Sequence, residues 1–126
     1  MTRKGLKPQK VRAERWGRWA EVWVAVCLFI RGYRILYHRY RCPHGEIDLI
    51  TKRGHCIIFV EVKFRSHFDD YDQVLPNIPA RRRLWRASQY YMKTRDDMNF
   101  LEQDFVIIVV SKSLKLTWFR EVFLDL

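Results

Sequence analysis

The sequence predicts an α/β protein in which helices flank a mixed central sheet of four to five strands. A helical stretch over residues 13–31 ends at Gly32, strand-like runs follow it, and a second helical stretch over 80–94 separates them from the last runs. An order of helix, three strands, helix and then one or two strands is typical of helices packed on a mixed sheet. A chain of 126 residues is long enough to build one such domain around a real core.

Each element is expected from a local signal. The first helix carries a long apolar run and is expected to be buried over much of its circumference, whereas the strand-like runs place apolar residues at every second position. Acidic residues and two prolines before the second helix indicate an exposed loop. The expected segments are a flexible basic arm at 1–12 and a single domain at 13–126, which holds a helix at 13–31, a strand at 33–40, a hairpin within 45–65, a loop at 66–79, a helix at 80–94, a strand at 105–111 and a pairing segment at 114–122.

The hairpin segment GEIDLITKRGHCIIFVEVKFR (45–65) places charged residues inside otherwise apolar strands. If Lys52 faces Ile57 across the short turn, antiparallel counting pairs Asp48 with Glu61. Directly opposed side chains on adjacent strands lie about 4.5–5.5 Å apart at Cβ. The spacing therefore predicts that these two carboxylates share one position on the sheet.

Two carboxylates forced together on a partly buried sheet repel each other, and a divalent cation removes this repulsion. Mg²⁺ and Mn²⁺ are held by one or two carboxylates together with waters and phosphate oxygens. Lys63 lies two residues beyond Glu61 and points to the same face, where an ammonium orients a water or offsets negative charge. The pattern indicates nuclease-like chemistry with Asp48 and Glu61 as metal ligands; the alternative is a solvated strand face with an ordinary surface ion pair.

Glu21 is the single acid inside the apolar stretch of the first helix. From a helix packed on the sheet, it would approach Lys63 or the two carboxylates and add a metal ligand or a water-positioning group. A surface ion pair with Arg15 or Arg18 is the alternative, and the sequence alone leaves both readings open.

The charge balance favours a polyanionic partner. Lys and Arg number 24 against 14 Asp and Glu, which gives a net charge of +10 and an isoelectric point near 9.9, and nucleic acid is the leading candidate. The second helix mixes arginines with Trp85, Tyr90 and Tyr91, which suits phosphate contact with base stacking. Successive arginines fan around a helix, so only some of them are expected to reach phosphate. The candidate nucleic-acid-binding residues are Arg65, Arg81, Arg82, Arg83 and Arg86.

Cysteine usage and hydropathy bear on location. Cys27, Cys42 and Cys56 make an odd number, and no secretory signal is expected at the start of the chain, so reduced thiols and a cytoplasmic location are expected. The apolar run at 22–30 has nine residues, about half of what a bilayer span requires. No membrane partner is therefore expected.

The segments GEIDLI and FVEVK, with Arg65 after them and a Glu-bearing helix closing in Gly32-Tyr33 before them, resemble the YraN family of small bacterial proteins. The resemblance covers residues 13–112. That family is similar to the restriction-endonuclease-like superfamily with its PD-(D/E)xK core, and to archaeal Holliday-junction resolvases in particular. The resemblance implies a restriction-endonuclease-like three-layer core, Mg²⁺ or Mn²⁺ as cofactor, DNA as partner with branched forms as candidate substrates, and a homodimer.

When the family's motif residues are transferred position by position, the resemblance implies which residues are catalytic. Asp48 takes the place of the motif Asp, Glu61 that of the acidic residue before the variable position, and Lys63 that of the motif Lys. Glu21 matches the acid on the first helix. The implied metal ligands are Asp48, Glu61 and Glu21.

Three positions depart from the family pattern. Ala20 stands where the family usually has Gly, Ile47 stands where the motif name has Pro, and Asp104-Phe105-Val106-Ile107 replaces a common Arg-Phe-Asp-Val. The last departure removes polar contacts expected on the final core strand but leaves the four assigned residues intact.

The function expected from these observations is hydrolysis of DNA phosphodiesters by a Mg²⁺-dependent nuclease. The first alternative is a binding module that keeps the fold and the basic surface but does not cut. The second is an adaptor protein that contacts a protein partner through exposed aromatic residues such as Trp118 and Phe119.

Overall fold

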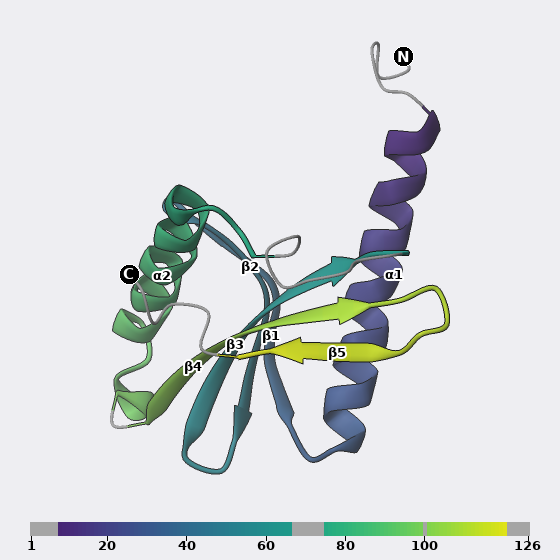
Figure 1. The fold of residues 1–126 in the computed structure, drawn as a ribbon. Helices are drawn as coiled ribbons and strands as arrows, with labels where there is room; N and C mark the ends of the chain where they lie inside the picture. The colour runs from purple at the N-terminus through teal and green to yellow at the C-terminus, as the bar shows by residue number, and fades with distance from the viewer. Residues whose placement is uncertain (1–7, 67–74, 100, 121–126) are drawn as a thin grey trace.

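A computed structural model describes residues 8–66, 75–99 and 101–120, and it describes the side chains of the first helix from residue 17 onward. Two helices and five strands alternate in the predicted order (Figure 1). The elements are α1 (Pro8–Ile30), β1 (Arg34–Cys42), β2 (Gly45–Arg53), β3 (Cys56–Phe64), α2 (Ile78–Lys93), the short 3-10 helix η2 (Asp96–Met98), β4 (Glu102–Val110) and β5 (Leu116–Phe119). The predicted α/β class is confirmed.

The strands form one mixed sheet in the order β1-β2-β3-β4-β5. Neighbouring strands are antiparallel except β3 and β4, which run parallel because α2 carries the chain back across the sheet. Lys52 pairs with Ile57 and Ile50 with Phe59, which confirms the hairpin register next to the turn. Gly54 has a φ of 60° in this tight turn, a conformation that glycine adopts without strain.

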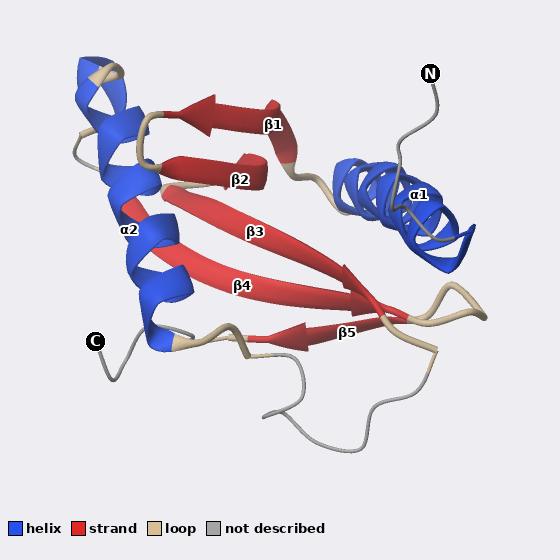
Figure 2. Cartoon of the chain, turned by 90° about the horizontal axis from the view of Figure 1, so that it is seen from above, coloured by secondary structure: helices blue, strands red, loops and turns tan. Residues whose placement is uncertain are grey.

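The two helices cover opposite faces of the sheet (Figure 2). Alternate residues of β3 point to opposite faces, so Ile58 and Val60 join one buried cluster with Leu28 of α1, while Ile57 and Phe59 belong to another. That second cluster contains the buried α2 residues Ala87, Tyr91 and Met92. The result is three layers, consistent with the expected three-layer core.

The buried stripe of α1 is narrower than expected. Ala20, Val24 and Leu28 recur every four residues and are at most 3% exposed, so they form the single face that packs on the sheet. The apolar residues on the opposite side of the helix remain exposed. They are Trp19, Val22, Val26, Phe29 and Ile30, at 44–76% exposure. A continuous apolar run therefore did not mean burial around the whole helix.

Several predicted boundaries differ from the observed ones. α1 begins at Pro8, so residues 8–12 are helical and only 1–7 of the expected basic arm remain, outside the described residues. α2 begins at Ile78, two residues early, because Asn77 caps it by accepting a hydrogen bond from the Ala80 amide at 2.9 Å. Most of the expected 66–79 loop, and the end of the last predicted strand beyond residue 120, also lie outside the described residues.

Trp118 and Phe119 are half-buried and do not form an exposed aromatic surface. Trp118 packs against Tyr33 with ring centroids 6.2 Å apart, and the Arg120 guanidinium lies 5.0 Å from its ring. The three cysteines are free. Within the described residues, no helix is both long enough and apolar enough to cross a bilayer.

Candidate active site

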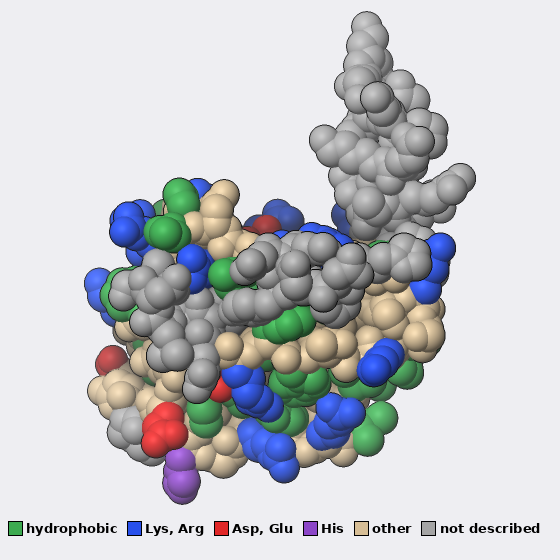
Figure 3. Space-filling view, viewed as in Figure 1, with side chains coloured by type: hydrophobic (Ala, Val, Ile, Leu, Met, Phe, Trp, Pro, Cys, Tyr) green, Lys and Arg blue, Asp and Glu red, His purple; other side chains and the backbone are tan. Residues whose placement is uncertain are grey.

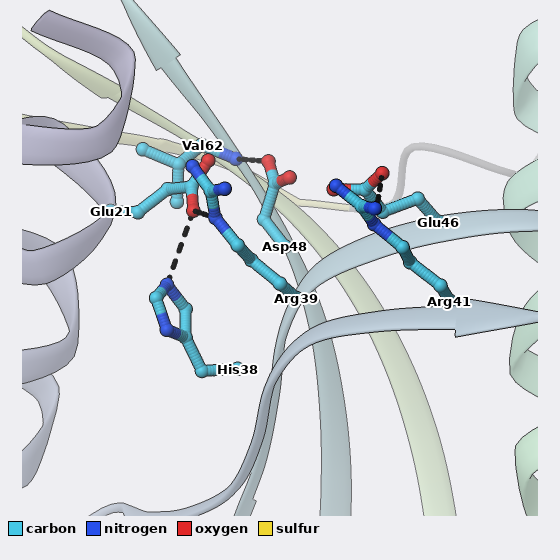
Figure 4. Close-up of polar contacts among 7 residues, drawn as sticks. All are labelled: Glu21, His38, Arg39, Arg41, Glu46, Asp48 and Val62. Atoms are coloured by element: carbon cyan, nitrogen blue, oxygen red, sulfur yellow. Dashed lines mark hydrogen bonds and ion pairs between the residues drawn. The ribbon is translucent and has the colours of Figure 1, made fainter. Parts of the chain in front are cut away.

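Asp48 lies where β2 separates from β3. The backbone pairing of these strands ends at Leu49 and Val60, one step before Asp48 and Glu61 would face each other. Instead of a backbone carbonyl, the Asp48 carboxylate accepts the hydrogen bond of the Val62 amide, with 2.8 Å between Oδ2 and N (Figure 4). The separation of the strands thus gives the Asp48 side chain a fixed place between them.

Glu61 and Lys63 extend from the same face of β3, as their spacing predicted. Lys63 Nζ lies 3.7 Å from Glu61 Oε2, and the two side chains are 27% and 23% exposed. This distance is longer than a hydrogen bond, and Glu61 Oε2 is buried without accepting a hydrogen bond from any described residue. Lys63 is the ion-pair partner of this oxygen, but the oxygen still lacks the hydrogen bond that a buried carboxylate usually accepts.

The environment of Asp48 disfavours its charge. Burial raises the pKa of this carboxyl from its ordinary value near 4 to about 7, although the Val62 hydrogen bond acts in the opposite direction. The charges of Glu21, Glu61 and Glu46 raise the pKa further. Three of the four assigned site residues, Glu21, Asp48 and Glu61, are therefore among the acids whose charges act on one another here.

Glu21 reaches the site from α1 and is held there by β1. Its Oε1 accepts hydrogen bonds from Arg39 Nε at 3.0 Å and from His38 Nε2 at 3.2 Å, and its side chain is 12% exposed (Figure 4). Among the described residues, Arg39 and His38 hold Glu21 and Arg18 forms no ion pair with it, whereas the side chain of the other alternative partner, Arg15, lies outside the described residues. Glu21 is thus largely buried and held by β1, but the described residues do not bring it into a metal-holding group of three acids with Asp48 and Glu61.

The sequence analysis did not single out Arg39 and His38, the two residues that hold Glu21. Tyr40 pairs with Ile47 and His38 with Leu49, so Arg39 is placed opposite Asp48. Counting across the β1–β2 turn would have found this position. Arg39 has a φ of 58°, which is unusual for a residue other than glycine and stores backbone strain next to the site.

The arginines of the nucleic-acid prediction fall into two groups. Arg82, Arg83 and Arg86 are exposed on α2, whereas Arg81 is only 5% exposed and is enclosed in the fold. Arg65 is half-buried, and its guanidinium donates to the Phe64 carbonyl at 2.8 Å. On the face shown in Figure 3, Lys and Arg side chains outnumber acidic ones. Of the five candidate residues, only the three arginines that face outward on α2 are therefore exposed to solvent.

The N-terminal half of α2 lies next to the carboxylates. A Cβ added at Gly45 would lie 3.6 Å from Arg83, which places the start of β2 against the helix. Glu61 and Leu84 line the same small cavity of about 20 Å³, together with Ile47. The exposed arginines and the acidic site therefore belong to one end of the sheet.

The donor set fits a hard divalent cation. Asp48 and Glu61 supply carboxylate oxygens, the type of ligand that Mg²⁺ and Mn²⁺ prefer, and one of these oxygens is buried without a donor. The described residues contain no group of three His, Cys, Asp or Glu side chains arranged to hold a metal. Two carboxylates are sufficient for Mg²⁺, which usually completes its shell with waters and substrate phosphate.

One protein-family model matches most of the chain. Residues 20–110 match the model of "Uncharacterised protein family UPF0102". The chain belongs to the UPF0102 family. This is the YraN family of the sequence resemblance, and the matched region of the UPF0102 chain spans α1 to β4 and includes all four assigned site residues.

Bacterial UPF0102 proteins are similar over most of the chain. A UPF0102 protein from Sinorhizobium medicae is 40% identical over 101 residues, 80% of this chain and 82% of the relative. One from Bradyrhizobium sp. is 41% identical over 113 residues, 88% of this chain and 79% of the relative. One from Synechococcus sp. is 34% identical over 107 residues, 83% of this chain and 80% of the relative.

Proposed function

We propose that this UPF0102 chain is a Mg²⁺- or Mn²⁺-dependent endonuclease that hydrolyses DNA phosphodiesters, with branched or flapped DNA as candidate substrates. The observation that carries the proposal is Glu61 Oε2, which is buried without a hydrogen-bond donor, 3.7 Å from Lys63 Nζ and close to Asp48. A cation bound between the carboxylates would compensate both charges. An ammonium beside a carboxylate pair is also suited to phosphoryl chemistry, because it can orient the attacking water or offset the negative charge that develops on the phosphate.

Each side chain has a role in this proposal. Asp48 and Glu61 hold the cation, with Asp48 fixed in place by the Val62 amide. When bound, the cation supplies Lewis-acid charge to the scissile phosphate and lowers the pKa of a bound water. Lys63 orients the attacking water or offsets the negative charge that develops on the phosphate. Glu21 completes the acidic cluster from α1, and Arg39 positions it.

The basic surface supplies affinity for the substrate in this proposal. Arg82, Arg83 and Arg86 contact the DNA backbone, and exposed Trp85 lies among them on α2 for stacking on an unpaired base. Backbone contacts carry no sequence information, so binding is expected to depend on the shape of the DNA and to weaken steeply with salt.

The test is a cleavage assay on duplex, single-stranded, flapped and four-way-junction DNA, with Mg²⁺ and with Mn²⁺. Wild type is compared with Glu61→Gln, which keeps the shape of the side chain but removes the charge that holds the cation. Cleavage by wild type that stops in EDTA and in Glu61→Gln supports the proposal. If no DNA form is cut with either metal, the chain is not a nuclease on DNA.

The alternative function is a non-cutting module that binds nucleic acid. The excess of basic residues favours it, because affinity for phosphate does not require the carboxylates. In that case, DNA affinity would fall steeply with salt and would be the same in Glu61→Gln as in wild type. A nuclease instead requires that cation and substrate bind together at Glu61.

The exposed face of α1 supports the further proposal that the chain forms a homodimer. Trp19, Val22, Val26, Phe29 and Ile30 form one apolar stripe on the outside of the helix. Their exposed surface amounts to roughly 500 Å², a substantial part of the roughly 800 Å² that each partner buries in a stable interface. A second copy of the chain presents the same stripe, so the two α1 helices bury each other's apolar surface.

The dimer predicts a mass in solution of twice the chain mass of 15.5 kDa, measured by light scattering after size exclusion. Phe29→Glu, which places a charge within the contact, is expected to give the monomer. Trp85→Glu is the matched control, because it changes an exposed aromatic residue on α2 and should leave the dimer intact. A monomeric wild type, or a dimer that Phe29→Glu does not weaken, would contradict this arrangement.

A further inference from the structure

A second group of cationic side chains lies at the other end of β2 from Asp48. Arg34, the first residue of β1, pairs directly with Lys52 near the end of β2, and His55 follows in the β2–β3 turn. At about 3.3 Å per residue along a strand, Lys52 is roughly 13 Å from Asp48. In Figure 1 the start of β1 and this turn lie at the lower edge of the sheet. The group is therefore separate from the candidate active site.

The pairing of Arg34 with Lys52 is unfavourable by itself. Directly opposed residues on antiparallel strands point to the same face, and like charges there are destabilising. The same two strands pair Arg41 with Glu46 at their other end, with 3.3 Å between Nε and Oε2. No ion pair joins Arg34 or Lys52 to an acid among the described residues. The end of the two strands with Arg41 thus contains an acidic partner, whereas the end with Arg34 and Lys52 has none among the described residues.

These cations line a cavity of about 320 Å³, which we call the hairpin pocket. Its lining residues are Arg34, Lys52, Gly54, His55, Asp97, Met98 and Leu101. Asp97 is its one acid, but Arg95 already pairs with it at 3.5 Å. Met98 and Leu101 are 8% and 7% exposed and provide an apolar wall. The volume lies within the range of small-molecule sites, which combine apolar walls with a few polar groups.

We infer that the hairpin pocket binds a phosphoryl group through Arg34, Lys52 and His55. An arginine fork and a lysine ammonium that approach from two strands match the several oxygens of a phosphate. Bound phosphate supplies the counter-charge that the Arg34–Lys52 pair lacks. The phosphate comes either from a free phosphorylated small molecule or from the backbone of a nucleic acid, and both sources present the same oxyanion to these side chains.

The experiment uses the whole chain in EDTA, so it does not depend on the metal site and is separate from the nuclease test. Inorganic phosphate, adenosine 5′-monophosphate and a short DNA duplex are titrated at constant ionic strength, with binding followed by NMR shifts and by calorimetry. Lys52→Gln and Arg34→Gln each remove one of the opposed charges. Lys112→Gln is the matched control, because Lys112 is an exposed lysine outside the pocket.

Wild type is expected to bind inorganic phosphate, and Lys52→Gln and Arg34→Gln to bind it at least about tenfold more weakly, because charged hydrogen bonds contribute most to such sites. Lys112→Gln should bind like wild type. Without phosphate, Lys52→Gln should be at least as stable as wild type, since the opposed charge is gone. This last result separates lost binding from lost folding.

The three probes also distinguish the two sources. Tighter binding of the nucleotide than of phosphate, lost in Lys52→Gln, identifies a free phosphorylated ligand. The source is a nucleic-acid backbone if only the duplex binds more tightly than inorganic phosphate, and if Lys52→Gln reduces the slope of log affinity against log salt concentration by the amount of about one phosphate contact. The inference is overturned if wild type does not bind phosphate, or if both pocket variants bind it as tightly as wild type.

Discussion

Replacing Asp48 with Asn is expected to raise the free energy of unfolding by up to about 4 kcal/mol at pH 8 in the absence of divalent metal. The pKa of this carboxyl is raised from near 4 to about 7 in the folded protein, and each unit corresponds to about 1.4 kcal/mol. An Asn side chain keeps an oxygen that accepts the Val62 hydrogen bond but carries no charge. The variant should therefore gain stability while losing a metal ligand.

The pH dependence of wild type follows from the same shift. Below pH 4, Asp48 is protonated in both the folded and the unfolded chain, so its burial does not reduce the stability of the folded protein there. Between about pH 4 and 7 the unfolded chain loses this proton while the folded chain keeps it, so stability falls as pH rises. Above pH 7, Asp48 is ionised in both the folded and the unfolded chain, so stability does not fall further because of this group.

Urea unfolding of wild type and Asp48→Asn across pH 4 to 8 measures this effect. The difference between the two curves should grow with pH up to about 7 and then level off. Glu102→Gln is the matched control, because Glu102 is an exposed acid at the start of β4 and is not among the acids that raise the pKa of Asp48, so its removal should change stability by less than about 1 kcal/mol. A difference that does not change with pH would contradict a buried, protonated Asp48.

Lys63→Ala is expected to reduce the rate of DNA cleavage at saturating metal by at least about 100-fold. Removal of a group that transfers a proton or stabilises developing charge in the transition state usually costs this much or more. DNA affinity should fall only slightly, since one phosphate contact at most is lost. The structural reason is the position of Nζ, 3.7 Å from the buried Glu61 oxygen.

Single-turnover cleavage rates measured beside DNA binding separate these two effects. Lys115→Ala is the control, because Lys115 is an exposed lysine outside the site and contributes only to the overall positive charge. It should cleave at close to the wild-type rate. If Lys63→Ala cleaves within about threefold of wild type while binding DNA equally well, Lys63 has no part in the chemistry.

The sequence predicted the part of the site that depends on strand periodicity. The position of the short turn predicted that Lys52 faces Ile57, and the structure contains this pair. It did not predict that the backbone pairing would end at Leu49, leaving the Asp48 carboxylate to bond the Val62 amide. Where two strands separate depends on what packs on each of them, and a local pattern carries no such information.

The remaining differences have the same origin. Arg39 adopts a positive φ, which no residue preference at that position indicates, and this backbone places its guanidinium against Glu21. In α1, the apolar run predicted a helix but not which side would be buried; only the spacing of Ala20, Val24 and Leu28 marks the covered face. Tertiary contacts decided both features.

The central claim is that Asp48 and Glu61 together hold one divalent cation. Calorimetric titration of Mn²⁺ into the protein at pH 7.5 tests it directly, with Glu61→Gln as the variant and Glu102→Gln, an exposed acid at the start of β4, as the control. One ion is expected to bind per wild-type chain and per Glu102→Gln chain, with affinity at least about tenfold weaker in Glu61→Gln, because one of two carboxylate ligands is lost. Equal affinity in wild type and Glu61→Gln, or no binding to wild type, would contradict the claim.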